Sequence, residues 1–324
     1  MSTDDAPVAM PDSIVITQTG FDPLGPQVRT TAVASGRTIN FIDEGDAAWP
    51  VTLFFGGAGT TVRAFGLLEF TRSMREQLGI RMISVERNGL GQTPFDPTVG
   101  LTQYAEDVWS LLDQLSVDQP AIVAISGGGP YAANVAATRT DRVRSMHLAC
   151  ALSEFADPPA IPVDVVASDP VAWWRFPPNS PTHVIPGFVD TTIEEATRGV
   201  FARGRDQPPH GLSQAFEFYR DTPLPDLSAL QIPAFLYWGT EDKALSLQHL
   251  ERWRAALPNV QATRLYVGEG HDIQYRHWDQ ILTDIAHLGQ RIVICFEGRT
   301  VLVPPDRAPT LMAAGATLGL CAWH

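Results

Sequence analysis

The segment AIVAISGGGPYAA, residues 121–133, is the feature that most constrains the fold of this chain. Five apolar residues typical of a buried strand lead directly into Ser126, and a run of small residues typical of a closely packed helix follows at once. A strand that passes into a helix over so sharp a turn needs small residues on both sides of it, and Ala124 and Gly128 occupy those positions. The pattern predicts that Ser126 lies exposed at the carboxyl end of a strand.

A phosphate-binding loop and a turn that merely packs a helix on a strand are the two other interpretations of this segment. The first lacks the Gly-Lys-Ser/Thr ending that such loops require, and the second stays open on this segment alone. If Ser126 is a nucleophile, the backbone N–H of Gly127 would point toward the oxyanion that develops during attack.

Apolar runs of strand length alternate with helix-like stretches along most of the chain. The runs cover residues 51–55, 81–85, 121–125, 143–152, 232–239 and 262–267, and the helix-like stretches cover 62–77, 101–115, 127–138, 246–257 and 275–287. Continuous apolar strands that alternate with helices indicate a mostly parallel sheet covered on both faces. We therefore predict an α/β fold, with a hairpin around Ser35-Gly36 ahead of the first parallel strand.

The alternation divides the chain into four parts. Residues 1–27 form a lead-in without periodicity, and residues 28–152 and 231–290 form the α/β core. Residues 153–230, rich in proline and aromatic residues, interrupt the core and are predicted to be a helical lid over Ser126. Four lid aromatics are candidates for the wall of an apolar substrate pocket: Trp173, Trp174, Phe176 and Phe188.

A serine hydroxyl is a weak nucleophile and needs an adjacent base. His271 stands in a glycine-rich turn after the run 262–267, from which its imidazole could reach Ser126. Asp242 follows the end of the preceding strand and could orient that imidazole and stabilise its charged form. Glu241 and Glu154 are the alternatives for this acid.

Glycines also follow the run 51–55, in the segment 56–59. We expect this loop to provide the second donor to the oxyanion, with Gly57 N–H as the first choice. A tight turn without such a role is the alternative.

At this point the chain resembles the α/β-hydrolase superfamily, from about Gly36 to Leu288. Five motifs in the order and spacing of that family carry the resemblance: 55–58 (FGGA), 86–93 (ERNGLGQT), 126–130 (SGGGP), 239–242 (GTED) and 268–271 (GEGH). The family has a histidine where Phe55 stands and an aspartate where Glu86 stands. Neither departure touches the triad that the resemblance implies, in the family's order of serine, acid and histidine.

The formal net charge of −13 disfavours binding to nucleic acid and to anionic membranes. The first twelve residues do not resemble a secretory signal, so we expect a cytoplasmic protein. No CxxC or HExxH pattern is present, and we predict no metal and no organic cofactor. The expected partner is a small-molecule substrate, and a homo-oligomer stays open.

The tail, residues 291–324, lies outside the part that resembles the family. Glu297-Gly298 between two β-branched runs predicts a hairpin, and a short helix is expected after it. We interpret the tail as a packing appendage with reduced thiols. A Cys295–Cys321 disulfide, or a site that uses Cys295, Cys321 and His324, is the alternative.

The resemblance and the residues together predict a serine hydrolase of the esterase or lactonase type that acts on a small to medium apolar substrate. The alternatives are a cofactor-free lyase or oxygenase, or a C–C hydrolase, on the same fold. A non-catalytic small-molecule receptor is a third hypothesis, which the complete triad disfavours.

Overall fold

The computed structural model describes residues 12–17, 26–154, 180–185 and 210–321. An eight-stranded sheet forms its centre, with the strand order β2-β3-β5-β4-β6-β7-β8-β9. β2 and β5 both pair with β3 in antiparallel fashion, and the pairs from β5 to β9 are parallel. The strands of this sheet are β2 (Arg29–Ala32), β3 (Thr38–Glu44), β4 (Val51–Phe55), β5 (Arg81–Val85), β6 (Ala121–Ile125), β7 (Ser145–Ala149), β8 (Ala234–Gly239) and β9 (Val260–Tyr266).

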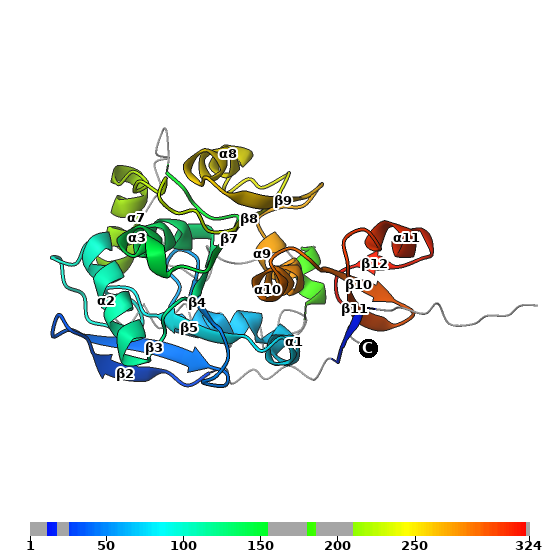
Figure 1. The fold of residues 1–324 in the computed structure, drawn as a ribbon. Coiled ribbons are helices and arrows are strands. Elements are labelled where there is room, and N and C mark those ends of the chain that lie inside the picture. Colours follow the sequence, from blue (N-terminus) through cyan, green and yellow to red (C-terminus); the bar gives the residue numbers. More distant parts are fainter. Residues whose placement is uncertain (1–11, 18–25, 155–179, 186–209, 322–324) are drawn as a thin grey trace, which may run out of the picture.

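Helices cover both faces of this sheet. Figure 1 shows α2 and α3 on one face and α1 and α10 on the other. The helices are α1 (Arg72–Gln77), α2 (Leu101–Gln114), α3 (Gly129–Thr138), α7 (His210–Asp221), α8 (Leu247–Ala256), α9 (Ile273–Arg276), α10 (Trp278–His287) and α11 (Ala308–Ala313). Short 3-10 helices cover Val62–Thr71, Ser126–Gly128, Thr140–Arg142 and Pro181–Val184.

The central strands confirm the prediction of a covered parallel sheet. β4, β5, β6 and β7 are buried along their whole length, which explains why they read as continuous apolar runs without alternation. The hairpin between β2 and β3 is also confirmed, and Gly36 adopts the positive φ of 83° that the turn requires.

Two predicted helices differ from the structure. The stretch 62–77 is a 3-10 helix up to Thr71 and an α-helix only from Arg72 onward. The stretch 275–287 is broken at His277 into α9 and α10. In each stretch the apolar residues have helical spacing. That spacing does not show whether the backbone hydrogen bonds follow the 3-10 or the α pattern, or at which residue a helix ends; tertiary packing determines both.

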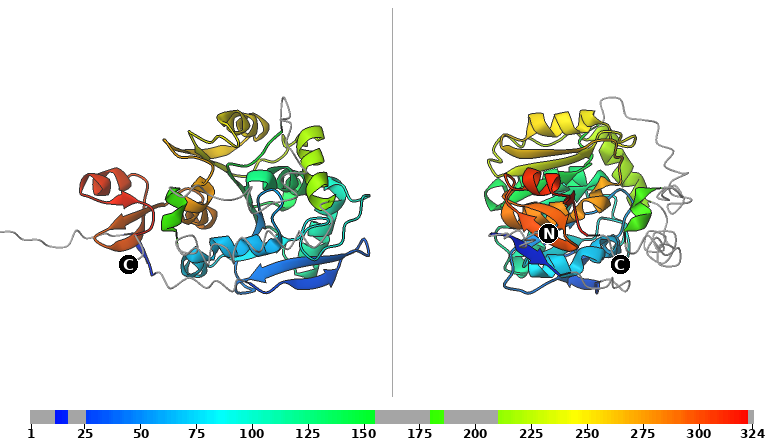
Figure 2. Two further views of the ribbon diagram at one scale, coloured as in Figure 1. Left: turned by 180° about the vertical axis from the view of Figure 1, so that it is seen from behind. Right: turned by 90° about the vertical axis from the view of Figure 1, so that its right-hand side faces the viewer.

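A second sheet of four antiparallel strands lies at one end of the molecule, beside α10 (Figures 1 and 2). Its strand order is β1-β11-β10-β12. The strands are β1 (Ile14–Ile16), β10 (Ile292–Phe296), β11 (Arg299–Val303) and β12 (Thr317–Leu318). The predicted hairpin at Glu297-Gly298 joins β10 to β11, and α11 follows it. Part of the lead-in therefore belongs to the same sheet as the tail.

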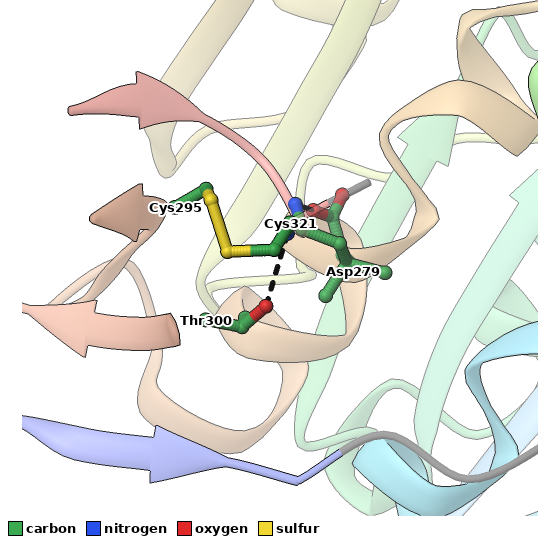
Figure 3. The surroundings of a disulfide bond; sticks show 5 residues. Asp279, Cys295, Thr300 and Cys321 are labelled. Carbon is green, nitrogen blue, oxygen red and sulfur yellow. Dashed lines mark hydrogen bonds between the residues drawn. A yellow bond between two sulfur atoms is a disulfide. The ribbon is translucent and has the colours of Figure 1, made fainter. Parts of the chain in front are cut away.

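A disulfide between Cys295 and Cys321 closes this second sheet (Figure 3). The Cys321 N–H donates to Thr300 Oγ1 at 3.0 Å, and the neighbouring Leu320 N–H donates to Asp279 Oδ2 on α10 at 3.0 Å. The expectation of reduced thiols in the tail is therefore wrong. The two cysteines are 26 residues apart in sequence, and the pairing of β10 with β12 brings them together, which a sequence pattern does not reveal.

The lid predicted over residues 153–230 falls mostly outside the described residues, so its helical character stays a prediction. The described helix α7 lies at its end. Among the helices in the described ranges, none has the length and apolar character needed to cross a membrane.

Candidate active site

Ser126 stands at the turn between β6 and α3, as the sequence predicts, but it is buried and not exposed as expected, because the neighbouring loops pack over the turn. Its φ of 49° lies in the left-handed region, which a residue with a side chain rarely adopts. Gly128 allows this turn to approach the neighbouring strand, because a Cβ at that position would lie 2.3 Å from Phe55 O. The Leu152 N–H donates to the Ser126 carbonyl at 2.7 Å and fastens the turn from the other side.

The structure brings the three predicted triad residues together. His271 Nε2 lies 3.0 Å from Ser126 Oγ, and His271 Nδ1 lies 2.8 Å from Asp242 Oδ2. With the Nδ1–H donating to the carboxylate, Nε2 is free to accept the hydroxyl proton of the serine. The order serine, histidine, acid in space therefore permits removal of a proton from Ser126.

Asp242 is held from several sides. Its Oδ1 accepts from the N–H groups of Ala244 and Leu245, both at 2.8 Å. Burial would raise the pKa of this carboxyl, but the hydrogen bond and charge of His271, the Leu245 N–H and the Cys150 thiol together lower it. The carboxylate is therefore ionised and fixed in the direction of the imidazole.

The alternative acids point elsewhere. Glu241 is exposed and pairs with Lys243 at 3.0 Å. Glu154 Oε2 accepts from Leu224 N–H at 3.2 Å. Of the three candidate acids, Asp242 is the one whose carboxylate contacts His271.

The loop after β4 packs directly against the turn that carries Ser126. The Gly57 carbonyl accepts from Arg87 Nη2 at 2.6 Å and from Thr60 Oγ1 at 2.8 Å. The same peptide group carries the N–H of Ala58, whose nitrogen lies 2.7 Å from the position of a Cβ on Gly127. Ala58 N–H is thus a donor candidate beside the predicted Gly57 N–H, and no sequence signal distinguishes the two positions.

Two residues of the motif 86–93 form hydrogen bonds with this loop and with the 3-10 helix after it. Arg87 is buried and also donates to Thr60 O at 2.7 Å. Glu86 accepts from Val62 N–H at 3.0 Å, and its burial raises its pKa to about 8. The glutamate that replaces the family's aspartate therefore anchors the 3-10 helix that begins at Val62.

The turn that carries His271 is anchored by the residues on either side of it. A Cβ on Gly239 would lie 2.3 Å from Glu269 O, so only glycine lets the two loops approach this closely. The Glu269 carboxylate accepts from Arg276 Nη1 at 2.6 Å and lies 2.9 Å from His277 Nε2. On the other side, Thr182 Oγ1 donates to Asp272 Oδ2 at 2.8 Å.

The four predicted pocket residues, Trp173, Trp174, Phe176 and Phe188, lie outside the described residues. Within the described ranges, one cluster combines metal-ligating side chains: Cys150, Asp242 and His271, whose ligand atoms lie within 4.8 Å of one another. Because Asp242 already binds His271 and two backbone N–H groups, this cluster is part of the hydrogen-bonded chain described above.

Comparison with known proteins gives the same fold. A family model described as the alpha/beta hydrolase fold matches residues 56–205. No curated protein sequence matches the chain.

Solved structures similar to this chain include hydrolases of several kinds. A hydrolase from Pseudomonas aeruginosa is 20% identical with a TM-score of 0.63, and covers 81% of this chain and 98% of its own. The esterase RhEst1 from Rhodococcus is 20% identical with a TM-score of 0.61, covering 81% and 99%. An enol-lactonase from Burkholderia xenovorans is 18% identical with a TM-score of 0.62, covering 79% and 98%.

Each of these structures is covered almost in full, while about a fifth of this chain has no counterpart in them. The mixed sheet, the turn at Ser126 and the matched family model agree with one another. The chain therefore has the alpha/beta hydrolase fold.

Proposed function

We propose that this protein is a serine hydrolase that cleaves carboxylic esters or lactones through an acyl-enzyme. The observation that carries the proposal is the hydrogen-bonded chain from Ser126 through His271 to Asp242. Esterases and an enol-lactonase among the similar structures support the choice of bond, since their fold is the same.

In the proposed reaction, Ser126 Oγ attacks the carbonyl carbon while His271 Nε2 takes its proton. Asp242 holds the imidazole and stabilises the imidazolium that forms. The electron pair of the carbonyl bond moves onto its oxygen, which accepts hydrogen bonds from Gly127 N–H and from the loop 56–59. His271 then gives the proton to the leaving alcohol. Water, activated by the same histidine, releases the acid from Ser126.

The substrate we propose is small to medium in size and apolar near the carbonyl. Phe55, where many family members carry a histidine, places an apolar ring at the end of β4, directly before the loop 56–59. The Trp and Phe residues of the insertion would complete an apolar wall, as ligand pockets generally require.

The test is intact-protein mass spectrometry after exposure to a fluorophosphonate, with wild type compared to Ser126→Ala. We expect one adduct on wild type and none on the variant. Glu241→Gln is the matched control, because this carboxylate neighbours Asp242 in sequence but faces Lys243.

A folded wild type that takes no adduct would contradict the proposal. That result would favour a lyase or oxygenase that forms no acyl-enzyme, or a non-catalytic receptor. If wild type does take the adduct, Ser126-dependent turnover of p-nitrophenyl acetate and of an aliphatic lactone, each compared with Ser126→Ala, shows whether it cleaves esters, lactones or both.

A further inference from the structure

Tyr219, on α7, carries a buried hydroxyl that the reaction described above does not use. The side chain is 2% exposed, and the one hydrogen bond recorded for its hydroxyl comes from Arg87, so among the described residues its proton has no acceptor. A buried hydroxyl without an acceptor is costly, so its position needs an explanation. Sequence patterns do not single out this residue, because it lies among other aromatics near the end of the insertion.

The hydroxyl lies directly beside Gly127. A Cβ on Gly127 would stand 2.7 Å from Tyr219 Oη, 2.7 Å from Ala58 N and 2.8 Å from Ala58 Cβ. The hydroxyl and the Ala58 N–H thus surround one point next to the residue that follows Ser126. A side chain at position 127 would occupy this space, and glycine keeps it open next to the tyrosine hydroxyl.

The electrostatic surroundings make this hydroxyl a hydrogen-bond donor. Arg87 faces it with a buried guanidinium and donates to the tyrosine oxygen. Arginine donates hydrogen bonds and accepts none, so it cannot take the tyrosine proton. Burial raises the pKa of Tyr219, and Arg87 opposes that rise without reversing it. The hydroxyl therefore keeps its proton while the nearby positive charge favours a negative oxygen in front of it.

We propose that Tyr219 Oη is a third donor to the oxyanion in the reaction of Ser126, beside Gly127 N–H and the N–H of the loop after β4. The inference rests on the proposed function. When Ser126 Oγ bonds to the carbonyl carbon, the π electron pair moves onto the carbonyl oxygen and the serine proton moves to His271. Tyr219 donates a hydrogen bond to that oxygen and transfers no proton. The carbonyl re-forms as the bond to the leaving group breaks, and the leaving group takes its proton from His271.

The experiment compares Tyr219→Phe with Tyr104→Phe. Tyr104 is also a buried tyrosine, and its hydroxyl donates to Val85 O at 3.0 Å. Tyr104→Phe therefore removes a buried hydroxyl, as Tyr219→Phe does, but one that is bonded to β5 instead of lying beside Gly127. The probes are a p-nitrophenyl ester, an alkyl trifluoromethyl ketone that becomes a hemiketal oxyanion on Ser126, and the corresponding secondary alcohol, which forms no oxyanion.

We expect Tyr219→Phe to lower kcat on the ester by about 100- to 1,000-fold with KM within about 2-fold, as removal of an oxyanion donor does. The same variant should weaken the trifluoromethyl ketone by a similar factor and leave inhibition by the alcohol unchanged. Tyr104→Phe should leave all three values within about 2-fold, although it lowers the melting temperature.

Two outcomes would overturn the inference. One is a Tyr219→Phe variant that keeps its affinity for the trifluoromethyl ketone, and the other is an equal loss for the ketone and the alcohol, which indicates general damage to the pocket. If wild type reacts with the fluorophosphonate and Tyr219→Phe reacts at the same rate, the third donor is absent while the proposed function stands. If wild type does not react at all, the proposed function itself fails.

Discussion

His271 Nε2 lies 3.0 Å from Ser126 Oγ, although 145 residues separate the two along the chain. Ser126 follows β6 and His271 follows β9, and the strands β7 and β8 lie between those two in the sheet. Because these strands are parallel, their carboxyl ends share one edge, and the loops that follow them meet there. The contact is therefore a property of the topology and of the loop lengths.

Replacing Asp242 by Asn should lower kcat by about 10³- to 10⁴-fold, because the amide favours the wrong imidazole tautomer at His271. The geometry of the site should change little, since Asn retains an oxygen for the N–H groups of Ala244 and Leu245. Steady-state kinetics on a p-nitrophenyl ester measures the loss. Glu241→Gln, as the control, should stay within about 2-fold. Equal losses for the two variants would show that Asp242 has no special part in the reaction.

Gly128→Ala should destabilise the protein by about 2 kcal/mol or more, because its methyl group would overlap backbone atoms at the end of β4. The nearest atoms are Phe55 O at 2.3 Å and Gly56 O at 2.9 Å, and neither belongs to a side chain that can move away. Urea denaturation measures the change. Gly100→Ala is the control, since a Cβ there meets nothing within 4 Å, and it should cost less than about 1 kcal/mol. Equal stability of the two variants would mean that β4 and the Ser126 turn can separate freely.

Glu86 should make the protein less stable as pH rises from about 4.5 to about 8. Burial raises its pKa from 4.5 to about 8 in the folded state, so over this range the unfolded chain releases a proton that the folded chain keeps. The free energy of unfolding then falls by up to about 1.4 kcal/mol per pH unit. Glu86→Gln should flatten that slope.

Urea denaturation of wild type and Glu86→Gln at several pH values between 5 and 8 measures this difference in slope. Glu76→Gln, on the surface beside Arg72, should run parallel to wild type. If the free energy of unfolding of Glu86→Gln changes with pH as steeply as that of wild type, Glu86 does not keep its proton in the folded state.

Replacing Cys295 and Cys321 together by serine should lower the stability of the tail by about 3 kcal/mol, from the loop closure that a separation of 26 residues provides. Hydrogen exchange should increase first in β12 and α11. Reaction with Ser126-directed fluorophosphonate should stay unchanged, because the tail lies in the second sheet. Alkylation of the unfolded protein before reduction should modify one thiol, that of Cys150. Three modified thiols would contradict the disulfide.

The central strands could be predicted from the sequence because a strand buried on both faces is an uninterrupted run of apolar residues. Residues 51–55, 81–85 and 121–125 are apolar throughout, and they coincide with β4, β5 and β6. The candidate triad could be predicted for a related reason. Ser126 directly follows β6, and Asp242 and His271 stand in the loops after β8 and β9, so all three lie at the edge where the parallel strands end.

The contacts that the sequence did not indicate are those between side chains brought together by packing. Cys150 lies beside Asp242, and Tyr219 lies beside Gly127, although neither residue stands in a motif. Glu269, between two glycines of the His271 turn, contacts Arg276 at the end of α9 and His277 at the break before α10. Such contacts depend on side-chain directions that apolar periodicity does not encode.

The pairing of β1 with β11 has a practical consequence for shortened versions of this protein. β1 covers one edge of β11, with Ile14 opposite Leu302 and Ile16 opposite Thr300. A chain trimmed to begin at Val28 would keep the whole eight-stranded sheet but leave the backbone of β11 unpaired along that edge. Free strand edges recruit other chains. The trimmed protein should therefore retain its catalytic groups and yet self-associate in solution.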